Sequence, residues 1–267
     1  MDSFVNVSGK KIFFSDVGSG HPIVFLHGWM ASRLVYTDVI SVLSKKYRCI
    51  SIDIPGFGRS DLVGRMTIKK IPPIIHKLLK RLKIDKFYLV GNSFGGAISI
   101  LYSNKYTRDV KKVVLISPFI NFKQFSKLTY YSIRYIIPYI LNKKILLPIF
   151  NFVKSLMNFK YKEVKDNNLS KLSKNERDKR KAINAFRIAY ELSSLDLYLE
   201  LRKMRKDILF IYGSKDSLLS IKPIESIFGL ITNIHLAIFE DVRHYIFTFD
   251  LHKLARKIDL FFSDNKV

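Results

Sequence analysis

Short, almost wholly apolar segments alternate along the chain with segments in which apolar residues recur at helical spacing. A run such as residues 22–26 is typical of a strand that is buried on both faces of a parallel sheet. Residues 73–82 instead collect their isoleucines and leucines on one side, which predicts an amphipathic helix. Further helices are predicted at 34–45 and 251–262. The pattern predicts eight strands, at residues 4–7, 11–17, 22–26, 47–54, 87–90, 110–117, 207–213 and 234–239.

This alternation of strands and helices predicts an α/β fold with a mostly parallel, eight-stranded sheet that helices flank on both faces. The first two strands are predicted to form a hairpin around Ser8-Gly9. In open sheets of this kind, ligands bind at the carboxyl ends of the strands. The loops with chemically interesting residues all follow predicted strands, so we expect them to meet at one edge of the sheet. These loops come after Leu26, Ile54, Val90, Gly213 and Phe239.

The segment 118–206 has a different pattern, in which aromatic and aliphatic residues mix with lysines and no strand is predicted. It contains 20 Lys+Arg and seven Asp+Glu, which is more than half of the chain's excess positive charge. We therefore expect a helical insertion at 118–206, between two parts of one core domain at 1–117 and 207–267.

The formal net charge is +24, from 46 Lys+Arg and 22 Asp+Glu. Such a charge favours contact with polyanions or anionic lipid headgroups. Drift in composition is the alternative, since the chain is also rich in Ile, Asn and Lys. Nucleic-acid binding is not expected, because no recognition module is present.

The single cysteine, Cys49, cannot form an internal disulfide, so no oxidising compartment is required. The first residues lack the pattern of a secretory signal, and no apolar run reaches about 18 residues. These observations predict a cytoplasmic protein, with peripheral contact at the inner face of the membrane as a further expectation.

The strongest chemical signal is the sequence Gly91-Asn92-Ser93-Phe94-Gly95, which joins a predicted strand directly to a predicted helix. A Gly-x-Ser-x-Gly turn in that context presents its serine at a sharp, strained apex. The glycines supply the room that this turn needs. The amide of Phe94, at the positive end of the new helix, can face a developing oxyanion. Ser93 is therefore the candidate nucleophile.

A serine nucleophile requires a base for its proton and an acid that orients the base. His244 is the best candidate base, because it lies just beyond the last predicted strand. Asp216 follows the penultimate strand and is the candidate acid. Asp241 competes with it, but it is so near His244 that we expect it to cap the strand end. Four other histidines fall in a turn, on a helix face, within a strand and in the last helix, at His21, His76, His235 and His252.

Taken together, these motifs resemble the α/β-hydrolase family, and the resemblance covers the whole chain. His27-Gly28-Trp29 is similar to the family's oxyanion loop, and residues 53–60 are similar to its structural Asp-x-Pro-Gly-x-Gly-x-Ser turn. The resemblance implies that Ser93 is the nucleophile, His244 the general base and Asp216 the orienting carboxylate. It also implies that the backbone amides of Trp29 and Phe94 form the oxyanion hole, and that 118–206 is a helical cap or lid. Leu251 departs from the family pattern, in which proline is frequent.

The implied function is a serine hydrolase, esterase-like or lipase-like, that cleaves carboxylic esters of apolar acids and requires no metal or cofactor. Serine at position 93 argues against haloalkane dehalogenase and epoxide hydrolase chemistry, which use aspartate. A carbon–carbon bond hydrolase or cofactor-free perhydrolase on the same triad is an alternative. Another is a catalytically idle fold that binds a membrane surface. The expected partner is a small-molecule or lipid ester, with contact to an anionic membrane. Candidate substrate-binding residues in the cap are Tyr131, Tyr135 and Phe150.

Overall fold

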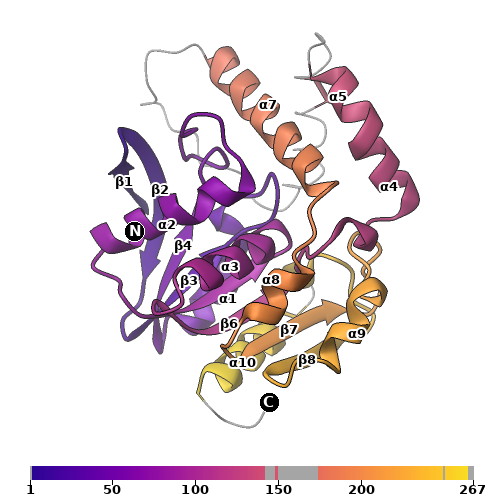
Figure 1. Cartoon of the computed structure of the whole chain (residues 1–267). Helices are drawn as coiled ribbons and strands as arrows, with labels where there is room; N and C mark the ends of the chain where they lie inside the picture. Colours follow the sequence, from indigo (N-terminus) through magenta and orange to yellow (C-terminus); the bar gives the residue numbers. More distant parts are fainter. Residues whose placement is uncertain (1, 142–147, 150–173, 249, 264–267) are drawn as a thin grey trace.

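An eight-stranded sheet forms the centre of the molecule and is parallel except at one edge (Figure 1). The computed structural model describes residues 2–141, 148–149, 174–248 and 250–263. The strand order is β1-β2-β4-β3-β5-β6-β7-β8, in which β2 is antiparallel to both β1 and β4. This confirms the predicted sheet. The strands are β1 (Asp2–Val7), β2 (Lys10–Val17), β3 (His21–Leu26), β4 (Tyr47–Ile52), β5 (Phe87–Asn92), β6 (Val110–Ile116), β7 (Ile208–Gly213) and β8 (Ile234–Phe239).

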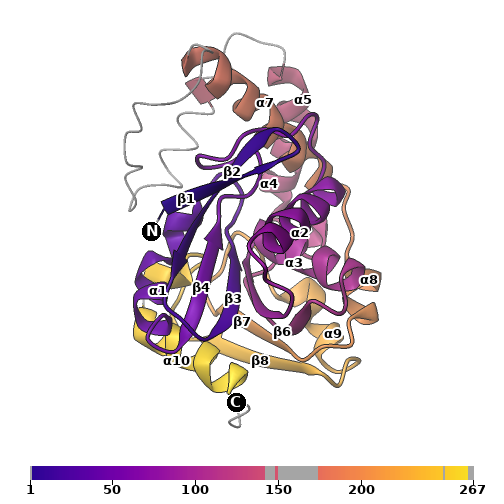
Figure 2. The ribbon, with the colours of Figure 1, turned by 90° about the vertical axis from the view of Figure 1, so that its left-hand side faces the viewer.

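Helices cover both faces of the sheet, as predicted (Figure 2). On one face, α1 (Thr37–Leu43) packs against α10 (Leu251–Phe262). On the other face lie α2 (Ile71–Arg81) and α3 (Phe94–Lys105), with α8 (Tyr198–Lys203) packed against α3. A short helix, α9 (Glu225–Phe228), precedes β8.

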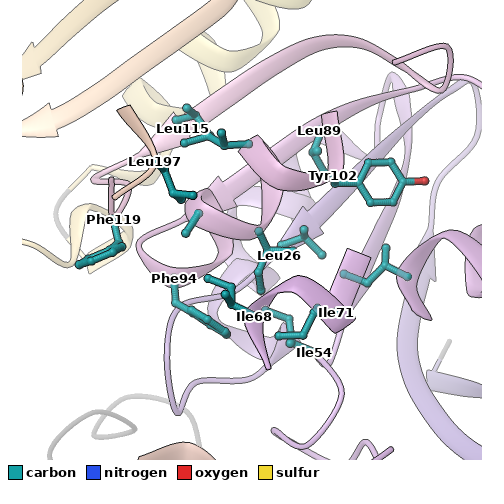
Figure 3. Close-up of a cluster of buried hydrophobic side chains, with 14 of the residues drawn as sticks. Leu26, Ile54, Ile68, Ile71, Leu89, Phe94, Tyr102, Leu115, Phe119 and Leu197 are labelled. Carbon is teal, nitrogen blue, oxygen red and sulfur yellow. The ribbon is translucent and has the colours of Figure 1, made fainter. Parts of the chain in front are cut away.

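Two buried clusters, one on each face, hold these helices to the sheet. Successive residues of a strand belong to different clusters: Leu26 lies in one, whereas Phe25 lies in the other. Because both faces bury apolar side chains, the strands are continuous apolar runs rather than alternating ones. Figure 3 shows the cluster that contains Leu26, Leu89, Phe94 and Leu115.

Some element ends differ from the prediction. The fourth strand ends at Ile52 rather than Ile54, because the Ile54 N–H donates to the His27 ring instead of to a neighbouring strand. The Asp53 carboxylate accepts the backbone N–H groups of Arg33 and Arg59. The helix predicted at 34–45 begins as a 3-10 turn (Arg33–Tyr36) and is α-helical only over Thr37–Leu43.

The described part of the segment 118–206 contains several helices. Helix α4 (Lys127–Tyr131) continues through a π-helical turn, η4 (Ser132–Ile136), into α5 (Ile137–Ile140). These helices and α7 (Lys174–Leu192) lie together at one end of the sheet in both views (Figures 1 and 2). The division of the chain into a core at 1–117 and 207–267 and a cap at 118–206 stays a prediction.

Among the residues that the structure describes, no helix combines the length and the apolar character that crossing a bilayer would require.

Candidate active site

Backbone hydrogen bonds tie together the loops at the carboxyl ends of β5, β6, β7 and β8. Ser93 N donates to the carbonyl of Ile116 at 2.9 Å, and Ser117 N donates to the carbonyl of Ile211 at 2.8 Å. On the next loop, Lys215 N donates to the carbonyl of Val242 at 2.9 Å. The loops that carry Ser93, Asp216 and His244 therefore share one edge of the sheet, as parallel strands in this order require.

Ser93 occupies the strained apex that its motif predicts. Its backbone has φ 52° and ψ −114°, a conformation that L-residues rarely adopt, and helix α3 begins at the next residue. A Cβ at Gly95 would collide with the carbonyl oxygen of Leu26, and one at Gly91 with the side chain of Ser99. Only glycine fits at either position. The Ser93 side chain remains partly exposed.

Asp216 and His244 form a buried pair. His244 Nδ1 lies 2.8 Å from Asp216 Oδ2, and the other carboxylate oxygen accepts the backbone N–H groups of Leu218 and Leu219, each at 3.0 Å. Burial alone would raise the pKa of Asp216. The hydrogen bond and charge of His244 and the hydrogen bond from the Leu219 amide together lower it by more, so the pKa is below its ordinary value. An ionised Asp216 makes Nδ1 of His244 the protonated nitrogen and leaves Nε2 able to accept a proton.

Gly213 explains how the acid and base loops come so close. A Cβ at this position would collide with the carbonyl oxygen of Val242, which belongs to the loop that carries His244. Asp241, the competing acid, is at the surface and its carboxylate lies 2.8 Å from Lys215 Nζ. Among the described residues, Ser93 makes no side-chain hydrogen bond, so the approach of its hydroxyl to His244 stays a prediction.

The loop after β3 runs alongside Ser93. A Cβ built on Gly28 would lie 3.5 Å from the Cβ of Ser93. His27 fixes this loop: its Nε2 accepts the Ile54 N–H at 3.0 Å, which makes Nδ1 the donor to the Gly28 carbonyl at 2.7 Å. Burial lowers the pKa of His27 by more than Asp53 and the Gly28 carbonyl raise it, so the ring is neutral. The roles of the Trp29 and Phe94 amides as oxyanion donors stay predictions.

Trp29 also connects this loop to the inserted segment. Its indole Nε1 donates to the carbonyl of Ala185 on α7 at 2.8 Å, and its ring contacts that of Phe186. No motif in the sequence predicts this contact, because the two residues are far apart in the chain. Helix α7 therefore holds the side chain of a residue whose backbone amide is a candidate oxyanion donor.

Replacing Trp29 with phenylalanine should lower kcat about tenfold while KM changes little, because the loop loses one anchor and small displacements of catalytic groups are costly. Steady-state kinetics on a soluble ester will measure both constants. Tyr88→Phe is a matched control, since it removes a ring-to-carbonyl hydrogen bond, to Phe262 at 3.2 Å, far from this loop. Equal losses in both variants would contradict a positioning role for Trp29.

The remaining predicted site residues are the candidates for substrate binding in the cap. Tyr131 and Tyr135 are exposed on α4 and η4, where their rings stack with each other. Their contact with substrate stays a prediction. Phe150 lies outside the described residues.

A second histidine–carboxylate pair, which the sequence did not predict, lies elsewhere. His76 Nδ1 is 2.8 Å from Asp109 Oδ2, and Tyr102 donates to the same oxygen at 2.9 Å. Asp109 directly precedes β6, so this pair lies at the amino ends of the parallel strands, opposite the Ser93 edge. It is therefore no competitor to His244 as the base.

Comparison with known proteins matches residues 21–251 to the sequence profile of the alpha/beta hydrolase fold. A pimeloyl-[acyl-carrier protein] methyl ester esterase of Wigglesworthia glossinidia brevipalpis is 32% identical over 109 residues, which is 40% of each chain. A 2-hydroxy-6-oxo-6-(2'-aminophenyl)hexa-2,4-dienoic acid hydrolase of Metapseudomonas resinovorans is 31% identical over 121 residues, 43% of this chain and 42% of that one. The matches thus span about two fifths of the length of these curated relatives. Other relatives are named as an epoxide hydrolase and haloalkane dehalogenases.

Among solved structures, a thermophilic esterase from Thermogutta terrifontis superposes with a TM-score of 0.74 and 16% identity, covering 100% of both chains. At that identity the likeness concerns the fold.

Proposed function

The chain belongs to the α/β-hydrolase-fold family, and from this premise we propose that it is a serine hydrolase that cleaves carboxylic esters of apolar acids. The observation that carries the proposal is the buried pair of His244 and Asp216 on loops tied to the Ser93 turn. The pair supplies a base whose tautomer is set by an ionised carboxylate, on the same edge as a partly exposed serine.

In the proposed reaction, Ser93 Oγ attacks the ester carbonyl carbon while His244 Nε2 takes the hydroxyl proton. Asp216 holds the ring and stabilises the imidazolium that forms. The backbone amides of Trp29 and Phe94 donate to the oxyanion. When the tetrahedral intermediate collapses, the carbon–oxygen bond to the alcohol breaks and His244 returns its proton to the leaving alcohol. A water molecule, activated by the same histidine, then hydrolyses the acyl-enzyme.

Serine at position 93 favours acyl transfer over the alkyl transfer that an aspartate nucleophile performs. The relatives include a methyl ester esterase and a hydrolase of a dienoic acid, so an ester and a carbon–carbon bond are the two candidate targets. An apolar acid is favoured by the apolar residues of the segment 118–206, which we propose to be the lid over the site. A carbon–carbon bond hydrolase is the second candidate.

Nitrophenyl esters of increasing acyl length, assayed beside a dienoic diketone, will separate these candidates. We expect ester turnover that increases from acetate to longer acyl chains, because more apolar surface is buried with each methylene. A fluorophosphonate probe should label Ser93 covalently. Cleavage of the diketone without ester turnover would favour the second candidate, and a chain that neither reacts nor becomes labelled would be a catalytically idle fold.

Peripheral contact with an anionic membrane is a further part of the proposal, and a lipid ester would then be a natural substrate. It is supported by the net charge of +24.

A further inference from the structure

The helix formed by α4, η4 and α5 has two distinct faces. Toward the rest of the protein, Ile133, Ile137 and Leu141 pack against the apolar cluster that Figure 3 shows in part. The guanidinium of Arg134 lies 5.0 Å from the centre of the Tyr190 ring on α7. These contacts fix the rotation of the helix about its axis, so the opposite face is held toward solvent.

That opposite face is apolar, although it faces water. We call it the outer helix face and define it by Leu128, Tyr131, Tyr135 and Ile136, which are 79%, 55%, 65% and 54% exposed. Spacings of three and four residues place Leu128, Tyr131 and Tyr135 on one side of a helix, and Ile136 adjoins Tyr135 in the chain. Single exposed apolar residues are ordinary on protein surfaces, but a contiguous group on one helix face marks an interaction surface.

The charge around this face indicates what it binds. Lys123 and Lys127 are exposed beside the start of the helix. Between Lys127 and Leu141, over which the helix runs, the sequence has no Asp or Glu. A second copy of the chain would bring like charges together, because each copy carries a net charge of +24. An anionic lipid surface instead attracts the lysines and accepts the apolar side chains.

The residue types agree with a membrane interface. Tyrosine combines an apolar ring with a polar hydroxyl and is enriched where acyl chains meet headgroups. A helix with aromatic and aliphatic side chains on one face and basic residues nearby lies in the plane of such an interface. Tyr131 and Tyr135 also stack, with ring centres 5.9 Å apart, which presents them as one surface.

We propose that the outer helix face is a docking surface for anionic lipid membranes. Supply of a lipid ester through this surface rests on the proposed function. Docking itself does not depend on the hydrolase activity. Because the helix lies at the end of the sheet that carries Ser93, docking would bring the lipid to the same end of the molecule (Figure 1). The predicted contact of Tyr131 and Tyr135 with substrate is compatible with this arrangement.

Co-sedimentation of the full chain with vesicles tests the proposal. The probes are vesicles of phosphatidylcholine alone and vesicles in which a third of the lipid is phosphatidylglycerol. All proteins carry Ser93→Ala, so that lipid hydrolysis cannot affect binding. The result for docking is therefore independent of whether the chain is an esterase. We expect binding to the anionic vesicles that weakens from about 0.1 M to about 1 M salt, as the Debye length falls from about 10 Å to about 3 Å.

Replacing Tyr131 and Tyr135 with serine, or Leu128 and Ile136 with serine, should weaken this binding at least about tenfold. The matched control is the pair Leu199→Ser and Leu230→Ser, since these leucines are 66% and 62% exposed outside the outer helix face. Circular dichroism will check that each variant is folded. Undiminished binding by both outer-face variants, or equal weakening by the control, would overturn the proposal.

A second measurement locates the contact. Cys49 is buried, so a cysteine introduced by Tyr135→Cys can be labelled selectively with an environment-sensitive fluorophore. Its emission should shift to the blue with anionic vesicles, while the same label introduced by Leu230→Cys should not respond. Analytical ultracentrifugation without lipid tests whether a second copy of the chain binds this face instead. A dimer that dissociates when Tyr131 and Tyr135 are replaced with serine would assign the face to a second copy and overturn the proposal.

Discussion

Replacing Ser93 with alanine is expected to lower kcat for ester hydrolysis about 10⁴-fold or more, and to abolish covalent labelling by a fluorophosphonate. Without the hydroxyl no acyl-enzyme can form, and His244 has no proton to accept. The residual rate would come from water and the oxyanion donors alone. Steady-state kinetics on a nitrophenyl ester and gel fluorescence after labelling will measure the two effects.

Ser93→Gly is the informative companion, because it separates chemistry from backbone strain. It should be as inactive as Ser93→Ala, yet more stable than Ser93→Ala by about 1 kcal/mol or more, since glycine adopts φ 52° without a steric penalty. Urea unfolding of both variants will give the difference. An alanine variant that retains near-normal turnover would show that another residue is the nucleophile.

Most of the sheet could be predicted from the sequence because each strand is short, apolar and bounded by turn residues. The ends of elements were less predictable, since they depend on contacts that periodicity does not encode. Ile54 is as apolar as the strand before it, yet its N–H donates to His27 rather than to a neighbouring strand. The 3-10 turn before α1 was missed for a similar reason, as its apolar spacing differs little from that of an α-helix.

The candidate site was predictable where one local motif dictates one geometry. A sharp strand-to-helix turn with serine at its apex accepts only glycine at positions 91 and 95, and the structure has that turn. Asp216 and His244 could be chosen because they follow neighbouring parallel strands. The link between Trp29 and Ala185 could not be predicted, because it joins a loop to a helix whose placement depends on packing rather than on sequence spacing.

Replacing Asp216 with asparagine should lower kcat about 10⁴-fold, although the side chains have nearly the same shape. An amide in place of the carboxylate can donate to Nδ1 of His244, which favours the tautomer in which Nε2 carries the proton and cannot act as a base. The matched control is Asp241→Asn, which alters a surface carboxylate three residues from His244 and should leave kcat nearly unchanged. If Asp241→Asn abolished turnover and Asp216→Asn did not, the acid would be Asp241.

Asp216→Asn should also change how the stability of the folded protein depends on pH. Because the pKa of Asp216 is lower in the folded chain than its ordinary value of about 3.9, the folded protein binds the proton less readily than the unfolded chain does. Ionised Asp216 therefore contributes stability that is present above the ordinary pKa and is lost as the pH falls through the lowered value. The urea midpoint of the wild type should exceed that of Asp216→Asn by more at pH 5 than at pH 3. A difference that stays constant over this range would mean that folding does not lower the pKa of Asp216. The loss of activity in Asp216→Asn would then have a cause other than the removal of an ionised partner of His244.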